Sequence, residues 1–464
     1  MNKEYCNQDS IKPTDLLMTR REYLKRFGMG MGTLSLASLL PNGSSAQVQQ
    51  PHFKSKVKRV IHVFFSGGQS HIDTWDPKSK LVEMDGQALP TGGLACGSPF
   101  KFNKYGKSGL EISEVFDKVA KHADDMVIIN SLHTDVPAHE ISTIMMNTGS
   151  LRFVRPSIGS WVVYGLGSAN DNLPSFISLR SGGMPLGGTQ NFGSAFLPGM
   201  YQGTPIDTSL GSVDRMIQNI SNKYFSKGEQ QKQMELLTKI NEIHQQNLKK
   251  DEALDSRIKS FELAFRMQTE ATDAFDISKE TQSTRDMYGA TAQGKQMLIA
   301  RRLAEKGVRF IQVWSGGFDN HNAIKTSLAN AAGQVDGPLA ALVQDLKNRG
   351  MLDETLIVCV GEFGRTNSRD GEGGVNGYGR SHWHKAMSAV LIGGGVKGGT
   401  VYGKTDELGY NVVENKMHIH EFHASILYGL GFDHRKLGYN YNGRFFKLTD
   451  TIDTDPEKFK AIFA

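Results

Sequence analysis

The chain contains several short apolar runs that carry no polar alternation, and this feature limits the folds that are open to it. They read RVIHVFF, DMVIINSL, SFISL, VRFIQVW, TLIVCVG and AVLIGGG, and stretches with helical spacing separate them. Strands buried on both faces of a mostly parallel sheet have this continuous apolarity, because helices cover both sides. The sequence therefore predicts an α/β fold with a mostly parallel central sheet.

One long segment breaks the alternation of strands and helices. From about residue 203 to 290 the strand patterns stop, and charged stretches with helical spacing such as MELLTKINEIHQQNL take over. We interpret this segment as a helical insertion that covers one side of the sheet. A solvated, charged helical face without a function is the simpler interpretation, since charge runs usually form such faces.

The N-terminus has the pattern of an export signal. Residues 19–25 read TRREYLK, and a weakly apolar stretch and the small residues GSSA follow. This pattern indicates a twin-arginine (Tat) signal peptide over residues 1–46, cleaved after Ala46 and read by the Tat export machinery. An amphipathic anchoring helix is the alternative, but the stretch is too short and too glycine-rich to span a bilayer of about 30 Å. We expect a periplasmic or secreted domain over residues 47–464 with no membrane span after cleavage.

The charge of the mature chain argues against a nucleic-acid partner. Removing residues 1–46 takes away six basic and four acidic residues, so the formal charge of +5 falls to +3. Nucleic-acid-binding domains usually show a larger, clustered basic surplus. We therefore expect no nucleic acid among the partners.

Histidine and carboxylate side chains stand where the predicted strands end. In open α/β sheets, ligands collect at the carboxyl ends of the strands. Mixed imidazole and carboxylate sets suit Zn, Mn or Fe, and Ca where oxygen ligands dominate. Each pair alone is typical of hydrogen bonding within a loop, but the joint placement predicts a divalent metal site. The candidate ligands are His71, Asp73, Asp319, His321, Glu362 and His382.

Two arginines lie in the same loops. Arg365 and Arg380 would place fixed positive charge beside the metal, and a guanidinium can grip two oxygens of a phosphate or sulfate. Their alternative role is a salt bridge to a neighbouring carboxylate. The segment 398–405 satisfies the pattern of a phosphate-binding P-loop, but no helical spacing follows its Lys-Thr, so we reject a nucleotide site there.

Five motifs together resemble a known bacterial family. They are RVIHVFFSGGQSHIDTWDPK, IARRLAEKGVRFIQVWSGGFDNH, LKNRGMLDETLIVCVGEFGRT, GRSHWHKAMSAVLIGGGVKGGTVYGKTDE and HEFHASILYGLGFDHRKL, and they span the chain from about Arg59 to its end. In this order they are similar to the exported domain-of-unknown-function family 1501, which is placed in the alkaline phosphatase and sulfatase superfamily. The resemblance implies a three-layer α/β sandwich with a metal-centred site for phosphate or sulfate esters.

The superfamily pattern transfers onto this chain only in part. Asp319, His321 and His382 match metal ligands of the superfamily, and Glu362 stands where an Asp is usual. Ser66 occupies the place of the usual first-strand Asp, which leaves His71 and Asp73 as substitutes. The position of the sulfatase nucleophile, nine residues before Thr148-Gly149, holds His139, which has neither a hydroxyl nor a thiol.

His139 is the remaining candidate for a catalytic role. The segment from Asp135 reads as the start of a helix, with Asp135 as its cap and Gly149 at its end. Because a helix N-terminus disfavours an imidazolium, we expect a neutral His139 that joins His71 and Asp73 at the site. It would bind a metal or take a proton from water. Direct nucleophilic attack and a purely structural role are the alternatives.

Two functions remain open from the sequence. The first is an exported metal-dependent hydrolase of sulfate or phosphate esters, whose anionic substrate includes sulfated polysaccharide as one candidate. The second is a non-catalytic relative that binds an anionic polysaccharide or a partner protein. The cluster of His and carboxylate residues favours the hydrolase, and the missing hydroxyl or thiol nucleophile favours the non-catalytic relative.

Overall fold

The computed structural model describes most of the chain after its first 49 residues. The predicted export signal over residues 1–46 lies outside the described residues, as do parts of the predicted insertion. The described residues are 50–217, 224–247, 262–263, 265–266, 273–373, 377–450 and 452–464.

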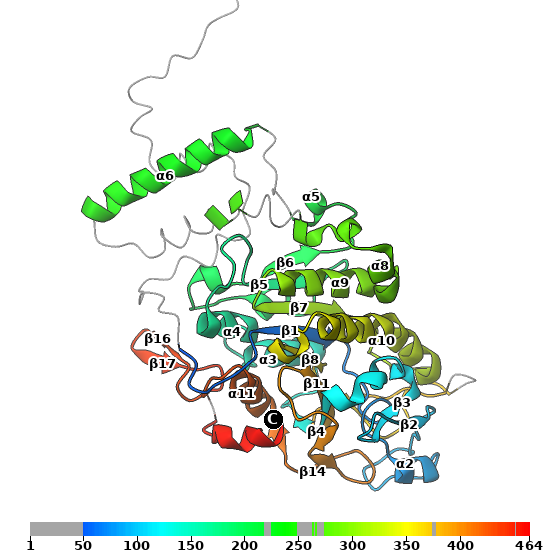
Figure 1. The fold of residues 1–464 in the computed structure, drawn as a ribbon. Helices are drawn as coiled ribbons and strands as arrows, with labels where there is room; N and C mark the ends of the chain where they lie inside the picture. The colour runs from blue at the N-terminus through cyan, green and yellow to red at the C-terminus, as the bar shows by residue number, and fades with distance from the viewer. Residues whose placement is uncertain are drawn as a thin grey trace, which may run out of the picture.

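A nine-stranded sheet forms the centre of the fold (Figure 1). Its order is β12-β4-β11-β8-β1-β7-β5-β6, and β15 also pairs with β4. The strands are β1 (Arg59–Phe65), β4 (Met126–His133), β5 (Phe176–Arg180), β6 (Thr204–Asp207), β7 (Phe310–Ser315), β8 (Thr355–Val360), β11 (Met387–Gly393), β12 (Thr400–Tyr402) and β15 (Met417–His418).

Every neighbouring pair in this sheet is parallel except those of β11. β11 runs antiparallel to both β4 and β8, whereas β1 pairs in parallel with β7 and β8. The start of β11 therefore lies at the sheet edge where β7 and β8 end. The expectation of a mostly parallel sheet is confirmed, with one reversed strand that the apolar runs do not distinguish.

Helices cover both faces of the sheet, which makes the three-layer α/β sandwich expected from the sequence (Figure 1). Along β1, Ile61, Val63 and Phe65 belong to one buried core, together with α9 and α10, and Val60 and Phe64 belong to the other, with α4 and α11. Successive side chains of a strand point to opposite faces, so each face needs its own apolar cover. The helices are α2 (Ser79–Glu83), α3 (His139–Thr148), α4 (Ile158–Leu166), α5 (Val213–Met216), α6 (Lys227–Asn247), α8 (Gln282–Tyr288), α9 (Ala292–Glu305), α10 (Ile324–Asn348) and α11 (Ile419–Gly429).

The described residues also form four two-stranded ribbons outside the central sheet. They are β2 (Phe102–Tyr105) with β3 (Leu110–Ser113), β9 (Gly364–Arg365) with β10 (His382–Trp383), β13 (Lys404–Thr405) with β14 (Val412–Glu414), and β16 (Tyr439–Tyr441) with β17 (Arg444–Phe446). Across the described residues, no helix combines the length and the apolarity that crossing a membrane would require.

The predicted insertion contains one strand that the sequence did not indicate. β6 begins at Thr204 and forms the edge of the central sheet, so residues 204–207 belong to the sheet. The polar helix α6 stands apart from the sheet (Figure 1).

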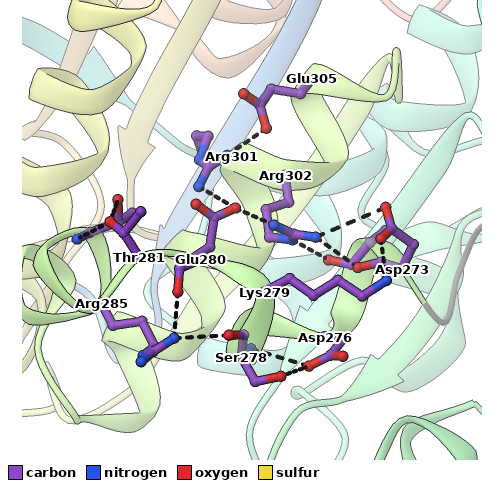
Figure 2. A network of polar contacts seen from close by, with 12 residues as sticks. Asp273, Asp276, Ser278, Lys279, Glu280, Thr281, Arg285, Arg301, Arg302 and Glu305 are labelled. Carbon is purple, nitrogen blue, oxygen red and sulfur yellow. Dashed lines mark hydrogen bonds and ion pairs between the residues drawn. The ribbon is translucent and has the colours of Figure 1, made fainter.

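A polar network joins the end of this region to α9 (Figure 2). Arg301 donates to Glu280 at 2.8 Å, and Arg302 also pairs with Glu280. Asp273 lies 2.8 Å from Lys306 and 2.5 Å from Lys279. Arg301 is 1% exposed, so its ion pairs lie in a largely dry environment. Removing one partner of a buried ion pair strongly destabilises the fold. These pairs therefore hold residues 273–280 against α9.

Candidate metal centre

Four loops meet at one end of the sheet, where the parallel strands β1, β4, β7 and β8 all finish. Asp319 and His321 follow β7, Glu362 and Arg365 follow β8, and His139 opens α3 after β4. His382 precedes β11, and it reaches the same edge because β11 runs antiparallel to β8. Because β11 is reversed, His382, which precedes its strand, lies beside residues that follow their strands.

Four of these side chains converge on one point. His139 Nε2 lies 3.3 Å from Asp319 Oδ1, and the same oxygen lies 3.0 Å from His321 Nε2 and 3.4 Å from His382 Nε2. The Nε2 atoms of His321 and His382 are 2.9 Å apart. One ligand atom from each residue lies within 4.8 Å of all the others.

The other ring nitrogen of each histidine faces an acceptor. His139 Nδ1 lies 2.7 Å from a Glu362 carboxylate oxygen, and His321 Nδ1 lies 2.7 Å from Asp370 Oδ2. His382 Nδ1 lies 3.0 Å from the carbonyl oxygen of Pro137. A carbonyl can only accept, so His382 Nδ1 must carry its proton, and the two carboxylates favour the same tautomer of the other rings.

When the rings are neutral, these tautomers leave three Nε2 lone pairs facing one another. Two lone pairs 2.9 Å apart repel, and the buried Nε2 of His139 has no hydrogen-bond partner. A cation between them resolves both problems. Four ligands about 2.05 Å from a tetrahedral Zn would be separated by about 3.3 Å, close to the distances measured here. Metal-bound histidines usually donate their second N–H to a carboxylate or carbonyl. The donor set therefore fits a divalent transition metal.

The electrostatics of the cluster centre on Asp319 and Arg365. Burial raises the pKa of Asp319, but the hydrogen bond and charge of Arg365, with the nearby histidines, outweigh burial and lower this pKa to about 2. Asp319 is therefore ionised across the physiological range. Its side chain is 47% exposed, so the cluster opens to solvent on this side, as catalytic metal sites do.

The expectation of a neutral His139 considered only the helix dipole. The hydrogen bond to Glu362 instead raises the pKa of His139, against the opposing effect of burial. α3 begins at His139 itself with Ala138 as its N-cap, so Asp135 is not the cap. Its carboxylate lies 3.2 Å from His418 Nε2. Gly149 ends the helix in the left-handed region, at φ 67°.

Glu362 lies behind the cluster. Its carboxylate is 1% exposed, and it accepts hydrogen bonds from His139 Nδ1 and, at 2.9 Å, from the backbone N–H of Gly67. Both interactions use Oε1 and hold the carboxylate behind the His139 ring. The structure therefore gives Glu362 the position of a residue that orients a ligand.

Three predicted site residues lie away from the cluster. Arg380 binds Asp73 through two hydrogen bonds of 2.6 and 3.1 Å, and both side chains are fully buried. His71 Nε2 lies 2.8 Å from the carbonyl oxygen of Gly409. The expectation that His139 joins His71 and Asp73 is therefore wrong, since these side chains serve as buried partners that fix the loop after β1. Arg380 has the salt-bridge role that was its alternative.

Arg365 also differs from the expectation that it grips an ester. It is 1% exposed, and it donates to the carbonyl oxygens of Gly67, Gly68 and Arg380 and to Asp319. Few donors are left for a substrate. Arg365 instead ties the loop after β1 to the loop that carries Asp319.

Glycine at the end of β1 makes this close approach possible. Gly67 has a φ of 116°, and a Cβ there would lie 2.4 Å from the backbone nitrogen of Asp319. A Cβ on Gly68 would lie 2.3 Å from the ring of Phe363. The two glycines of SGGQ therefore allow the loops after β1, β7 and β8 to touch.

Sequence reasoning missed two groups that orient the ligands, Asp370 and the carbonyl of Pro137. Asp370 lies in a polar loop between β9 and β10, 49 residues from His321. No strand end or motif marks that position. A backbone carbonyl has no signature in a sequence.

Comparisons with solved structures returned distant similarities. The PsFucS1 sulfatase from Pseudoalteromonas sp. matches with a TM-score of 0.32 and 14% identity over 76% of this chain and 66% of its own. This chain thus spans slightly less than two thirds of that sulfatase. The lipoteichoic acid synthase LtaP from Listeria monocytogenes matches with a TM-score of 0.36 and 10% identity over 86% of this chain and 78% of its own.

A protein in the alkaline phosphatase superfamily from Vibrio parahaemolyticus matches with a TM-score of 0.32 and 9% identity, over 83% of this chain and 75% of its own. A search of curated proteins found no match. Residues 57–460 match the family described as "Protein of unknown function (DUF1501)". This match covers most of the chain, and the protein therefore belongs to the DUF1501 family.

Proposed function

We propose that the protein is an exported metal-dependent hydrolase of sulfate or phosphate esters. The observation that carries the proposal is the convergence of three Nε2 lone pairs and one carboxylate oxygen at a solvent-open point. A structural site would be closed by its ligands, whereas the exposed side of Asp319 leaves room for a substrate.

The proposed ligands are His139, Asp319, His321 and His382. Three imidazoles and one carboxylate favour Zn, Mn or Fe over Ca, which prefers oxygen ligands. When bound, such a metal polarises an ester oxygen and lowers the pKa of water enough to supply a nucleophile at neutral pH.

The protein's own groups around this point suit an anionic ester. The first N–H groups of α3, those of His139, Glu140 and Ile141, have no acceptor within the described residues, and Ala138 offers no capping side chain. Such groups at a helix N-terminus favour an anion. Arg365 balances the charge of Asp319 and holds its carboxylate in place.

The position of His139 bears on the choice between the two functions left open by the sequence. A missing hydroxyl favoured a non-catalytic relative only if nothing else could supply a nucleophile. With Nδ1 held by Glu362 and Nε2 directed at the cluster, His139 is better suited to hold a metal than to attack an ester. A water activated at the proposed centre would then be the candidate nucleophile, and this favours the hydrolase over the non-catalytic relative.

Metal analysis and hydrolysis assays on the same samples test this proposal. Protein purified without chelators should contain close to one equivalent of metal and should hydrolyse 4-nitrophenyl sulfate or 4-nitrophenyl phosphate. Asp319→Ala and His382→Ala should lose metal and turnover while remaining folded, because loop ligands contribute little to core packing. Asp353→Ala, an exposed carboxylate elsewhere, serves as the control.

Each failure has a distinct meaning. Metal below about a tenth of an equivalent would reject the metal centre, since a tight site retains its ion through purification. Full metal occupancy with no turnover of either ester would instead favour the non-catalytic relative that binds an anionic polysaccharide or a partner protein.

A further inference from the structure

A cleft lies along edge strand β12 of the sheet, and none of the proposed metal ligands lines it. It has a volume of about 930 Å³, within the range of small-molecule sites. Edge strand β12, the ribbons β2–β3 and β13–β14, the loop after β1 and the C-terminal segment enclose it. We call it the lysine cleft, after Lys78, Lys104, Lys397, Lys404 and Lys458 in its lining.

The lysine cleft gathers two motifs that the metal centre does not use. Residues 75–78 (WDPK) line it from the loop after β1, and residues 400–404 (TVYGK), within the segment that resembles a P-loop, line it from the other side. In the structure that segment forms strands β12 and β13 and no helix follows it. A P-loop needs a helix N-terminus at its Lys-Thr, so the cleft is not a nucleotide site of that type.

Two of the five lysines form ion pairs, and the other three have no partner among the described residues. Lys78 lies 2.8 Å from Asp76, and Lys458 lies 2.7 Å from Glu421. The Nζ atoms of Lys104, Lys397 and Lys404 make no hydrogen bond or ion pair with the described part of the chain. The lining holds five lysines against three carboxylates, so the cleft carries a surplus of positive charge in a concave surface, which attracts anions.

Carboxylates are interspersed with these lysines. Glu111 stands opposite Lys104 across β2–β3, and Glu414 stands opposite Lys404 across β13–β14. Carboxylates accept hydrogen bonds from hydroxyl groups and repel a ligand with charge on every unit. The half-exposed Val401 adds apolar surface. The lining thus suits a ligand with spaced acidic groups, hydroxyls and apolar faces.

We propose that the lysine cleft binds an acidic oligosaccharide, meaning one that carries sulfate or carboxylate groups at intervals along a hydroxylated chain. Uronic acids and sulfated sugars combine all three features. A polyphosphate has the charge but lacks the hydroxyls and the apolar faces, and it would face three carboxylates in the lining.

The cleft and the metal centre are separate sites. The cleft lies along edge strand β12, whereas the proposed ligands follow β4 and β7 or precede β11. None of the proposed metal ligands lines the cleft. Binding in the cleft therefore requires neither metal nor turnover, and the inference stands independently of the proposed function.

Calorimetric titration of the full protein with a chondroitin sulfate hexasaccharide tests the proposal. Binding is expected for this probe and is expected to be absent for neutral dextran. The double substitution Lys397→Gln/Lys404→Gln should weaken binding about 2- to 30-fold, the range for losing two exposed charge pairs. The matched control, Lys121→Gln/Lys436→Gln, removes two exposed lysines outside the cleft and should stay within about twofold of wild type.

Two further measurements separate this site from the metal centre. Lys397→Gln/Lys404→Gln should keep the wild-type rate on a 4-nitrophenyl ester, and His382→Ala should keep wild-type affinity for the hexasaccharide. Equal weakening by the control pair, absence of hexasaccharide binding, or tighter binding of inorganic polyphosphate would each overturn the proposal. Loss of affinity in His382→Ala would place the ligand at the metal centre and would overturn it as well.

Discussion

Glu362→Gln is the substitution that most directly tests how the side chains of the proposed metal centre are held in place. Gln keeps the size of Glu, but the charge is lost and one oxygen becomes an NH2 group. In the structure Oε1 accepts from both His139 Nδ1 and the Gly67 N–H, and Oε2 lies 3.2 Å from the same Gly67 nitrogen. If the Gln oxygen keeps its bond to His139, the NH2 group takes the place of Oε2. It then faces the Gly67 N–H, which is also a donor.

The expected loss follows from the environment of the carboxylate. Removing a partner of a metal-bound histidine typically costs about 10- to 100-fold in metal affinity, or about 1.4–2.7 kcal/mol. Glu362 is 1% exposed, whereas Asp370, which holds His321 in the same way, is 34% exposed. Water screens the more exposed partner, so Glu362→Gln should fall near the upper end of this range and Asp370→Asn near the lower end.

Competition with a chromophoric chelator measures both affinities, and Glu372→Gln, an exposed carboxylate two residues from Asp370, is the control. Its affinity should match that of the wild type. If Glu362→Gln stays within about twofold of wild type, or if Asp370→Asn has the larger effect, the view that buried carboxylates orient the imidazoles is refuted.

Three further outcomes are expected. Gly67→Ala should lose metal and stability, because its Cβ would meet the Asp319 backbone, whereas Gly316→Ala should be tolerated because nothing lies within 4 Å; thermal unfolding compares them. Arg380→Met should destabilise the fold by about 3–5 kcal/mol in urea, because it strands a buried carboxylate. Burial, reinforced by neighbouring Asp117, raises the pKa of Asp336 to about 6. A raised carboxyl pKa stabilises the fold below about pH 4, and this contribution is lost as pH rises to 6. Asp117→Asn should reduce that loss, as urea unfolding at both pH values would show.

The central layers of the fold could be predicted because burial leaves a direct trace in the sequence. Continuous apolar runs marked β1, β5, β7 and β8, since both faces of these strands pack against helices. The direction of β11 has no such trace, because a buried strand has the same composition in either direction. β6 was missed for a related reason. It is four residues long, contains a proline and lies at the sheet edge, where apolarity is not required.

The site could be predicted in part because loops after parallel strands meet at one edge. This argument gave Asp319, His321 and His382, which the structure brings together. It also gave His71 and Asp73. The sequence cannot distinguish a side chain that faces the site from one that is buried under the same loop. Their partners are a backbone carbonyl and an arginine 307 residues away, and neither pairing is visible in the order of residues.

Glu362 and His139, two of the three positions where the sequence departs from the superfamily pattern that it resembles, form one hydrogen-bonded pair. At the place where the pattern has a hydroxyl nucleophile, the imidazole of His139 reaches into the cluster. At the place where it has an Asp ligand, the side chain is longer by one methylene and accepts a hydrogen bond from that imidazole. In the proposed metal centre, the His139 imidazole would need an acceptor for its second N–H, and Glu362 is placed to supply it. Each residue thus explains the other. Glu362→Asp should draw the acceptor away from the His139 ring, and His139→Ser should leave the Glu362 carboxylate with the Gly67 N–H as its donor in the described part of the chain.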